Sequence, residues 1–218
     1  MPERPKAILF DIGNVLVRLK TGEFLKKISE ACPSLPPERM THELRDPESR
    51  HIAYERGEIS GRDFHAHLAA AYGLPWGYEA WLAVWNDYFL PNRPMDVLLA
   101  KLRHQLRFWA LSNTNAEHFR HLRQEYRLFD GFEGLVGSHE HGQRKPEPRL
   151  YEIALEKMKL PAASVVYIDD LERNVEAARA LGMPAFHYTF NDPALRGFLS
   201  GLGLEIPAWD KLPSPYTC

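Results

Sequence analysis

Cysteine, long hydrophobic runs and an excess of basic residues are all scarce or missing in this sequence. The 218 residues include two cysteines, Cys32 and Cys218, which lie far apart. A disulfide framework or a thiolate metal site is therefore not expected, and a reducing compartment is the default. No apolar stretch approaches the length of a membrane span, and residues 1–18 lack the layout of a signal peptide. These absences predict a cytoplasmic protein with no membrane partner.

The charge balance argues against a nucleic-acid partner. Lys and Arg total 27 against 29 for Asp and Glu, so the formal net charge is −2. A protein that holds a phosphate backbone needs an excess of basic groups, which this chain does not have. The length suits one domain with a sizeable insertion, or two small domains. Composition leaves the oligomeric state open.

Five short apolar segments recur along the chain, separated by segments with helical periodicity. Continuous apolar runs of this length are typical of strands buried on both faces of a parallel sheet. These runs cover residues 7–10, 106–111, 134–137, 165–168 and 185–188. Apolar residues at helical spacing predict crossover helices over residues 148–158 and 171–181. The alternation predicts an α/β fold with an open parallel sheet.

Residues 21–91 interrupt this alternation. The segment has helical patterns and many aromatic side chains, and Pro91, Asn92 and Pro94 mark its end. We predict a helical cap over residues 21–91, inserted into an α/β core formed by residues 1–20 and 92–218. The aromatic side chains are expected to form the interior of this insertion rather than a ligand cage. They are Tyr72, Trp76, Trp81, Trp85 and Phe89.

Polar residues follow three of the predicted strands, at the edge where open α/β sheets bind their ligands. These residues are Asp11, Ser112 with Asn113, and Asp169 with Asp170. Each alone is typical of a helix cap or a turn. Their order, together with Lys145 just before the predicted helix over residues 148–158, predicts one shared polar site.

The segments that carry these residues resemble the four motifs of the haloacid dehalogenase superfamily. The segments are residues 10–16 (FDIGNVL), 111–115 (LSNTN), 144–146 (RKP) and 167–170 (YIDD). The chain is similar to the bacterial branch that includes the α-D-glucose-1-phosphate phosphatases, and more distantly to the phosphatase domain of bifunctional epoxide hydrolases. The resemblance implies a Rossmann-like core of five parallel strands, with a helical cap inserted after the first strand. Periodicity predicts the same layout independently.

The resemblance implies a Mg²⁺-dependent phosphatase that works through an aspartyl-phosphate. Asp11 would be the nucleophile, a recognised role for carboxylates. Asp11, Asp170 and the backbone carbonyl of Gly13 would bind Mg²⁺, which prefers such oxygen ligands. Asp169 would lie close behind them without binding the metal directly.

The resemblance also implies a phosphate site. Lys145 would act in catalysis and would bind phosphate together with Ser112 and Asn113, helped by the backbone amides near Asn113 and Thr114. Lys145 and one divalent ion would offset the charge of three carboxylates and so admit a phosphate dianion. The expected partner is a small phosphorylated metabolite, and the expected substrate is a sugar phosphate such as glucose 1-phosphate.

Gly13 departs from the pattern of most phosphatases of the superfamily, which have a second aspartate there as general acid and base. The glucose-1-phosphate branch shares the replacement, so activity is still expected. Two alternatives stay open. A catalytically weak phosphate-binding or regulatory protein is favoured by Gly13, whereas a 2-haloacid dehalogenase is disfavoured by the Asp169–Asp170 pair, because dehalogenation needs no metal.

Three further features have weaker interpretations. Asn174 is either a helix residue that satisfies the loop above it or a support for the site. The polar segment from His139 to His141 is expected to be a solvated loop rather than a metal site. The cap segment from Tyr54 to Arg56 is expected to influence the choice among substrates, although a surface salt bridge is the favoured role for Tyr54 and for Arg56 taken singly.

Overall fold

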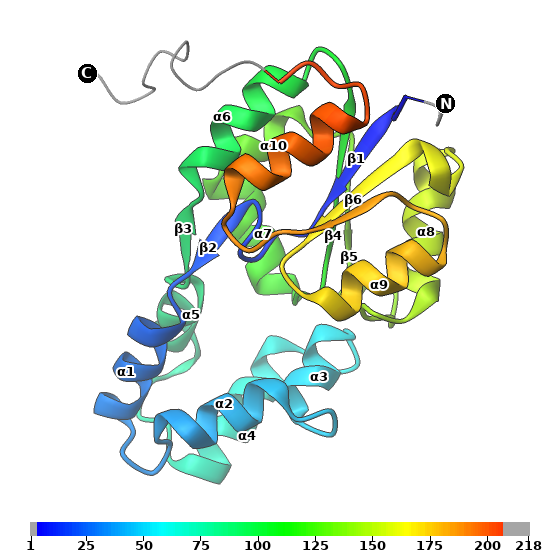
Figure 1. Cartoon of the computed structure of the whole chain (residues 1–218). Helices are drawn as coiled ribbons and strands as arrows, with labels where there is room; N and C mark the ends of the chain where they lie inside the picture. The colour runs from blue at the N-terminus through cyan, green and yellow to red at the C-terminus, as the bar shows by residue number, and fades with distance from the viewer. Residues whose placement is uncertain (1–3, 207–218) are drawn as a thin grey trace, which may run out of the picture.

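The core of the protein is a five-stranded, fully parallel sheet with the strand order β5-β4-β1-β6-β7 (Figure 1). The computed structural model describes residues 4–206, so Cys218 lies outside the described residues. The strands are β1 (Ala7–Phe10), β4 (Arg107–Ser112), β5 (Gly134–Gly137), β6 (Val165–Asp169) and β7 (Ala185–His187). The five predicted strands and the α/β class are confirmed.

Helices cover both faces of the sheet. Side chains alternate across each strand, so both faces of these apolar strands carry side chains that are buried by helices. Ile8 and Phe10 of β1 pack into one buried cluster, and Ala7 and Leu9 pack into another. The first face carries α6 (Arg93–Leu102), α7 (Ala116–Glu125) and α10 (Asp192–Gly201). The second carries α8 (Pro148–Met158) and α9 (Glu172–Ala180) (Figure 1). Burial on both sides explains why the strand sequences are continuously apolar.

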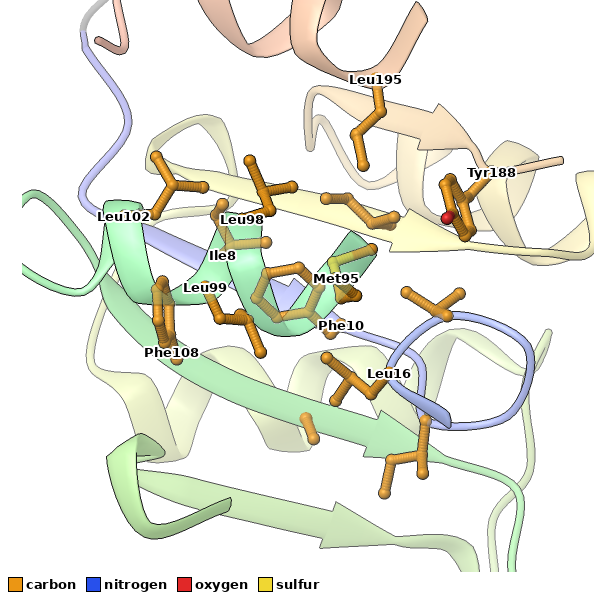
Figure 2. Close-up of a cluster of buried hydrophobic side chains, with 14 of the residues drawn as sticks. Ile8, Phe10, Leu16, Met95, Leu98, Leu99, Leu102, Phe108, Tyr188 and Leu195 are labelled. Carbon is orange, nitrogen blue, oxygen red and sulfur yellow. The ribbon is translucent and has the colours of Figure 1, made fainter. Parts of the chain in front are cut away.

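The nucleophile strand is held in place by the first of these clusters. Figure 2 shows Met95, Leu98 and Leu99 of α6 packed against Phe10. The ring of Phe10 also meets the ring of Phe108 edge-on, with the ring centroids 5.8 Å apart. Each such buried side chain contributes about 1.5–3 kcal/mol of hydrophobic stabilisation. The packing fixes the end of β1, which is where Asp11 begins the loop.

Five helices lie between β2 (Val17–Leu19) and β3 (Phe89–Pro91), within the predicted insertion. They are α1 (Thr21–Ala31), α2 (Pro37–Arg45), α3 (Arg50–Glu55), α4 (Gly61–Tyr72) and α5 (Tyr78–Asn86). Trp81 and Trp85 are buried at the centre of their own hydrophobic cluster, and Tyr72 and Trp76 pack against it. The aromatic residues therefore form the interior of the insertion as predicted, except Phe89, which packs with the sheet cluster instead.

The two strands that flank the insertion pair with each other as an antiparallel ribbon. Sequence periodicity missed this ribbon, because three residues are too few to show a strand pattern. The remaining elements are the short 3₁₀ helices η1 (Arg127–Gly131), η2 (Ser138–Glu140) and η3 (Ala162–Ser164). Within residues 4–206, none of the helices has the length and apolar character required to cross a membrane.

Candidate active site

Asp11 lies at the carboxyl end of the central strand β1 and is almost completely buried. Its backbone N–H donates to the carbonyl of Ile168, and its Oδ1 accepts from the N–H of Ile12 at 2.7 Å. Burial raises the pKa of Asp11 to about 8, Lys145 opposes this, and the carboxylates of Asp169 and Asp170 add to it. A bound cation would favour the ionised form that nucleophilic attack requires.

Lys145 is the cation at the centre of the site. Its Nζ lies 2.6 Å from Asp11 Oδ1 and 2.8 Å from Asp169 Oδ2, and the residue is only 3% exposed. Burial alone would lower the pKa of Lys145, but the two adjacent carboxylates raise it overall. Lys145 therefore carries a charge throughout the physiological range.

Asp169 is fully buried, and both of its oxygens are engaged. Oδ1 accepts from the backbone N–H of Leu171 at 2.8 Å and from Asn174 Nδ2 at 3.0 Å. Oδ2 accepts from Lys145, from the hydroxyl of Tyr167 and from Asn174. Burial would raise the pKa of Asp169, but Lys145 and the other donors lower it overall. Asp169 is thus an ionised anchor for Lys145, and Asn174 supports that anchor.

Asp170 is in a different environment from its neighbour. It is only partly buried, and its Oδ2 accepts from Asn14 Nδ2 at 3.0 Å. Asn14 has a left-handed backbone (φ 53°) and also accepts from the N–H of Leu19 at 3.3 Å. Sequence reasoning quoted Asn14 only as part of a motif. Its role in joining the first and fourth motif loops appears only once the chain is folded.

The donor set fits a magnesium ion. Ligand oxygens of Asp11, Asp169 and Asp170 all lie within 4.8 Å of one another, the one cluster of this kind among residues 4–206. When all three carboxylates are ionised, they and one lysine leave about two negative charges, which a divalent cation would balance. Carboxylate oxygens are the ligands that Mg²⁺ prefers.

The predicted phosphate-binding residues have mixed environments. Ser112 ends β4 and is buried beside the site. The side chain of Asn113 is occupied elsewhere: its Nδ2 donates to the carbonyl of Lys145 at 2.9 Å, and its Oδ1 accepts from the N–H of Lys145 at 2.7 Å. The N–H of Thr114 donates to Ser138 Oγ at 2.9 Å, so this amide already has a partner within the protein. Asn113 positions Lys145, and only its backbone N–H is left for a phosphate.

Comparison with known proteins agrees with this geometry. The family described as haloacid dehalogenase-like hydrolase matches residues 5–182. The chain belongs to the haloacid dehalogenase-like hydrolases. It is therefore an enzyme of the hydrolase class, with the parallel core and motif order that its sequence resembles.

Individual relatives of this hydrolase include a phosphatase, an epoxide hydrolase and a metal-bound structure. The chain is 31% identical over 191 residues to the sesquiterpene phosphatase astK of Aspergillus oryzae, covering 84% of this chain and 90% of that protein. It is 32% identical over 91 residues to bifunctional epoxide hydrolase 2 of Rattus norvegicus, covering 42% and 16%. A HAD family enzyme, bt-2542 of Bacteroides thetaiotaomicron, was solved with magnesium and inorganic phosphate; it is 27% identical, with a TM-score of 0.70 over 84% and 93% of the two chains.

Gly13 of this hydrolase lies beside an apolar side chain. A Cβ built at Gly13 would lie 3.4 Å from Leu19 Cδ1 and 3.7 Å from Leu19 Cδ2, which is ordinary van der Waals contact. The space next to the nucleophile loop, where a general acid would begin, is therefore bordered by the methyl groups of Leu19. Sequence reasoning noted the missing acid but had no means to find its neighbour.

The segment from Tyr54 to Arg56 contacts the core of the hydrolase. The Tyr54 hydroxyl donates to Glu117 of α7, and Arg56 pairs with Glu147 and donates to the Gly142 carbonyl at 2.7 Å. Glu55 is held twice: Ser138 Oγ donates to its carbonyl at 2.6 Å, and Arg144 pairs with its carboxylate at 2.7 Å. We name residues 54–57 the latch segment, because they join the insertion to the loops around η2 and α8.

The loop at His139 is also part of this contact. His139 is half-buried, its ring packs against Phe119, and burial lowers its pKa. Gly57 has φ +72° and approaches so closely that a Cβ there would lie 2.2 Å from the His139 carbonyl oxygen. The expectation of a solvated loop holds for Glu140, which is exposed, but not for His139, which packs against Phe119 and the latch segment.

Proposed function

We propose that this hydrolase is a Mg²⁺-dependent phosphatase of small phosphorylated metabolites that uses Asp11 as its nucleophile. The observation that carries the proposal is the buried contact between Asp11 and Lys145, next to the carboxylates of Asp169 and Asp170. A buried cation beside a carboxylate cluster suits phosphoryl transfer, which depends mainly on positioning and charge neutralisation.

The reaction has two displacement steps. A carboxylate oxygen of Asp11 attacks phosphorus, and the ester P–O bond breaks as an aspartyl-phosphate forms. The departing alkoxide oxygen takes a proton from water and leaves as the alcohol. Water then attacks that intermediate, which releases inorganic phosphate and restores the carboxylate. Lys145 stabilises the negative charge on the transferring oxygens, while Asn113 and Asp169 keep Lys145 in place.

Three groups would hold the metal: the carboxylates of Asp11 and Asp170 and the backbone carbonyl of Gly13. When bound, Mg²⁺ would neutralise charge on the phosphate and on the carboxylates. Asp169 is the poorer ligand, because its oxygens already accept hydrogen bonds from four residues. Ser112 would bind a phosphate oxygen through its hydroxyl.

Residues 21–91 would act as a cap over a core formed by residues 1–20 and 92–218. The ribbon of β2 and β3 supports this division, because the chain enters the insertion through β2 and leaves it through β3. A sugar phosphate such as glucose 1-phosphate, which the sequence resemblance implies, is one candidate substrate. The sesquiterpene phosphatase relative adds phosphate esters of apolar alcohols as another. A cytoplasmic location stays the expectation from cysteine content.

The test is phosphate release from a panel of phosphomonoesters, with and without Mg²⁺, for the natural protein and for Asp11→Asn. We expect release that requires Mg²⁺ and that Asp11→Asn abolishes while its circular dichroism spectrum is unchanged. Substantial turnover by purified Asp11→Asn would remove the nucleophile assignment. Phosphate binding without turnover would favour the binding-protein alternative, and metal-independent halide release from 2-chloropropionate would favour the dehalogenase.

A further inference from the structure

Three large hydrophobic side chains are well exposed within residues 4–206: Leu90 at 44%, Leu171 at 41% and Phe190 at 46%. Isolated exposed leucines are ordinary on a protein surface. Leu171 and Phe190 follow the carboxyl ends of β6 and β7, and Leu90 lies in the ribbon that leads into the insertion. We name them the apolar edge. Grouped exposed apolar residues beside a catalytic site commonly mark a binding surface.

Two members of the apolar edge, Leu171 and Phe190, follow the carboxyl ends of β6 and β7, where the carboxylates of the site also lie. Leu171 directly follows Asp170, and its backbone N–H donates to Asp169 Oδ1 at 2.8 Å. Phe190 follows β7, two residues after Tyr188, whose N–H donates to the carbonyl of Asp169 at 2.9 Å. Because β6 and β7 are adjacent parallel strands, both residues lie at the sheet edge that carries the metal-binding loop.

The third member is linked to Phe190 through Arg18. The Arg18 guanidinium carbon lies 5.0 Å from the centre of the Phe190 ring. Arg18 is directly opposite Leu90 in the β2–β3 ribbon, so these two side chains project from the same face. Phe190 adopts φ +57°, a left-handed conformation that is costly for an aromatic residue. The fold thus keeps an exposed ring at this place in spite of its backbone cost.

One apolar side chain, Leu19, also lies beside the nucleophile loop. Leu19 methyl groups border the position at which a side chain on residue 13 would begin. A sugar makes many hydrogen bonds, and a pocket for it would need polar groups here. An apolar group gains free energy from contact with Leu19 and the apolar edge and needs no hydrogen-bond partners.

We propose that the leaving group of the substrate is an apolar alcohol or phenol, and that Leu171 and Phe190 determine this specificity by burying it. The proposal rests on the phosphatase function proposed above and narrows its substrate class. The phosphate would lie at Asp11 and Lys145, and the apolar group would extend past Leu19 toward the apolar edge.

The experiment uses phenyl phosphates with a para methyl, butyl or octyl group, each below its micelle concentration. The leaving-group acidity is nearly constant in this series, so only the apolar area changes. We expect kcat/KM to rise with chain length, by up to about fourfold for each methylene that becomes buried. A flat dependence, with turnover present, would overturn the proposal and leave the phosphatase function standing.

Two variants and one control locate the contact. Phe190→Asn tolerates the left-handed backbone, and Leu171→Ser supplies a hydroxyl at the N-cap of α9, so both are expected to fold. Each should flatten the dependence of kcat/KM on chain length, with the largest loss on the octyl compound and the smallest on the methyl compound. Leu202→Ser, at the far end of α10, should keep the full dependence. A dependence that survives in both edge variants would refute the assignment.

Binding separates this inference from the phosphatase proposal. Asp11→Asn can be titrated with the same compounds in the presence of Mg²⁺ by calorimetry, without turnover. Tighter binding of the longer chains, lost in Phe190→Asn combined with Asp11→Asn, supports the apolar edge even if the natural protein releases no phosphate. Equal binding of all three compounds, or tighter binding of glucose 1-phosphate than of the octyl compound, would overturn it.

Discussion

At the residue scale, the adjacent residues Asp169 and Asp170 have different environments and therefore different expected roles. Asp169 is the last residue of β6 and points into the protein, where four donors saturate it. Asp170 is the first residue beyond the strand and accepts from Asn14. A saturated, ion-paired carboxylate supports Lys145, whereas a less saturated one is available to a metal ion.

Replacing each aspartate by asparagine tests this difference. Asp170→Asn should raise the Mg²⁺ concentration needed for half-maximal activity by at least about tenfold, with little change in stability. Asp169→Asn should lower the free energy of unfolding by about 3–5 kcal/mol, because it breaks a buried ion pair with Lys145. Activity titrated with Mg²⁺ and urea denaturation of both variants give the two readouts. The opposite order of Mg²⁺ dependence would exchange the two roles.

Gly13 makes a second prediction at this scale. Without an acid there, turnover should depend steeply on the acidity of the leaving alcohol, so that sugar 1-phosphates and aryl phosphates react faster than sugar 6-phosphates. Gly13→Asp should raise the rate of phosphoryl transfer most for substrates with poor leaving groups, by at most about 10²–10⁴-fold. The contact with Leu19 leaves room for the added Cβ. Single-turnover phosphoryl transfer is the measurement, because hydrolysis of the intermediate also lacks its usual base.

Gly13→Ala is the matched control, since it adds the Cβ without the carboxylate. It should leave the dependence on leaving-group acidity steep. A shallow dependence in the natural protein would mean that another residue supplies the proton.

At the scale of elements, the latch segment changes what the insertion is expected to do. The sequence favours substrate choice for the segment and surface salt bridges for Tyr54 and Arg56 singly. Their side chains contact the core at Glu117, Arg144 and Glu147. Such contacts hold α3 against the core around η2. Loss of one contact should loosen the insertion for every substrate alike.

Arg56→Gln is the corresponding test. It removes a partly exposed ion pair, worth about 0.5–1 kcal/mol, and activity should fall uniformly by roughly two- to fivefold on all substrates. Arg62→Gln is the control, because it breaks an exposed ion pair with Glu79 inside the insertion and should have no effect. Relative kcat/KM values on two unlike substrates check this. An altered ranking without a general loss would restore the substrate-contact hypothesis.

At the scale of the whole molecule, His118 makes the junction of the two parts sensitive to acid. It is buried in α7, stacks on Trp85 of the insertion with ring centroids 4.7 Å apart, and bonds through Nε2 to the Trp85 carbonyl at 2.9 Å. Its Nδ1 lies 3.2 Å from the Asn115 amide nitrogen, which is a hydrogen-bond donor. Protonation of Nδ1 would turn it into a donor as well, so two donors would face each other. Burial lowers the pKa of His118 to about 3.

This shift predicts acid destabilisation. Below the unfolded pKa of about 6.5, the unfolded chain binds a proton that the folded chain rejects until about pH 3. The free energy of unfolding should therefore fall by up to about 1.4 kcal/mol per pH unit across that window, and His118 should contribute no pH dependence above pH 7. Urea denaturation at pH 4–8 measures this. His118→Gln should reduce the slope, whereas exposed His42→Gln should retain it.

The sequence by itself determined the layered core and the set of residues at its edge. Burial on both faces forces each strand to be continuously apolar, so the strand positions can be read locally, and the parallel arrangement brings Asp11, Ser112 and Asp169 to one edge. The Lys145 contact with that edge was implied only by the resemblance.

Only the tertiary structure decided how those residues are supported. The Asn14–Asp170 bond joins positions 156 residues apart, and the Asn113–Lys145 clamp joins positions 32 apart. The β2–β3 ribbon, the latch segment and the apolar edge likewise depend on contacts between distant segments. Local patterns encode burial and periodicity, but a polar side chain reads the same whether it binds a metal, a neighbouring loop or water. Its role is decided by the partner that the fold brings within hydrogen-bond distance.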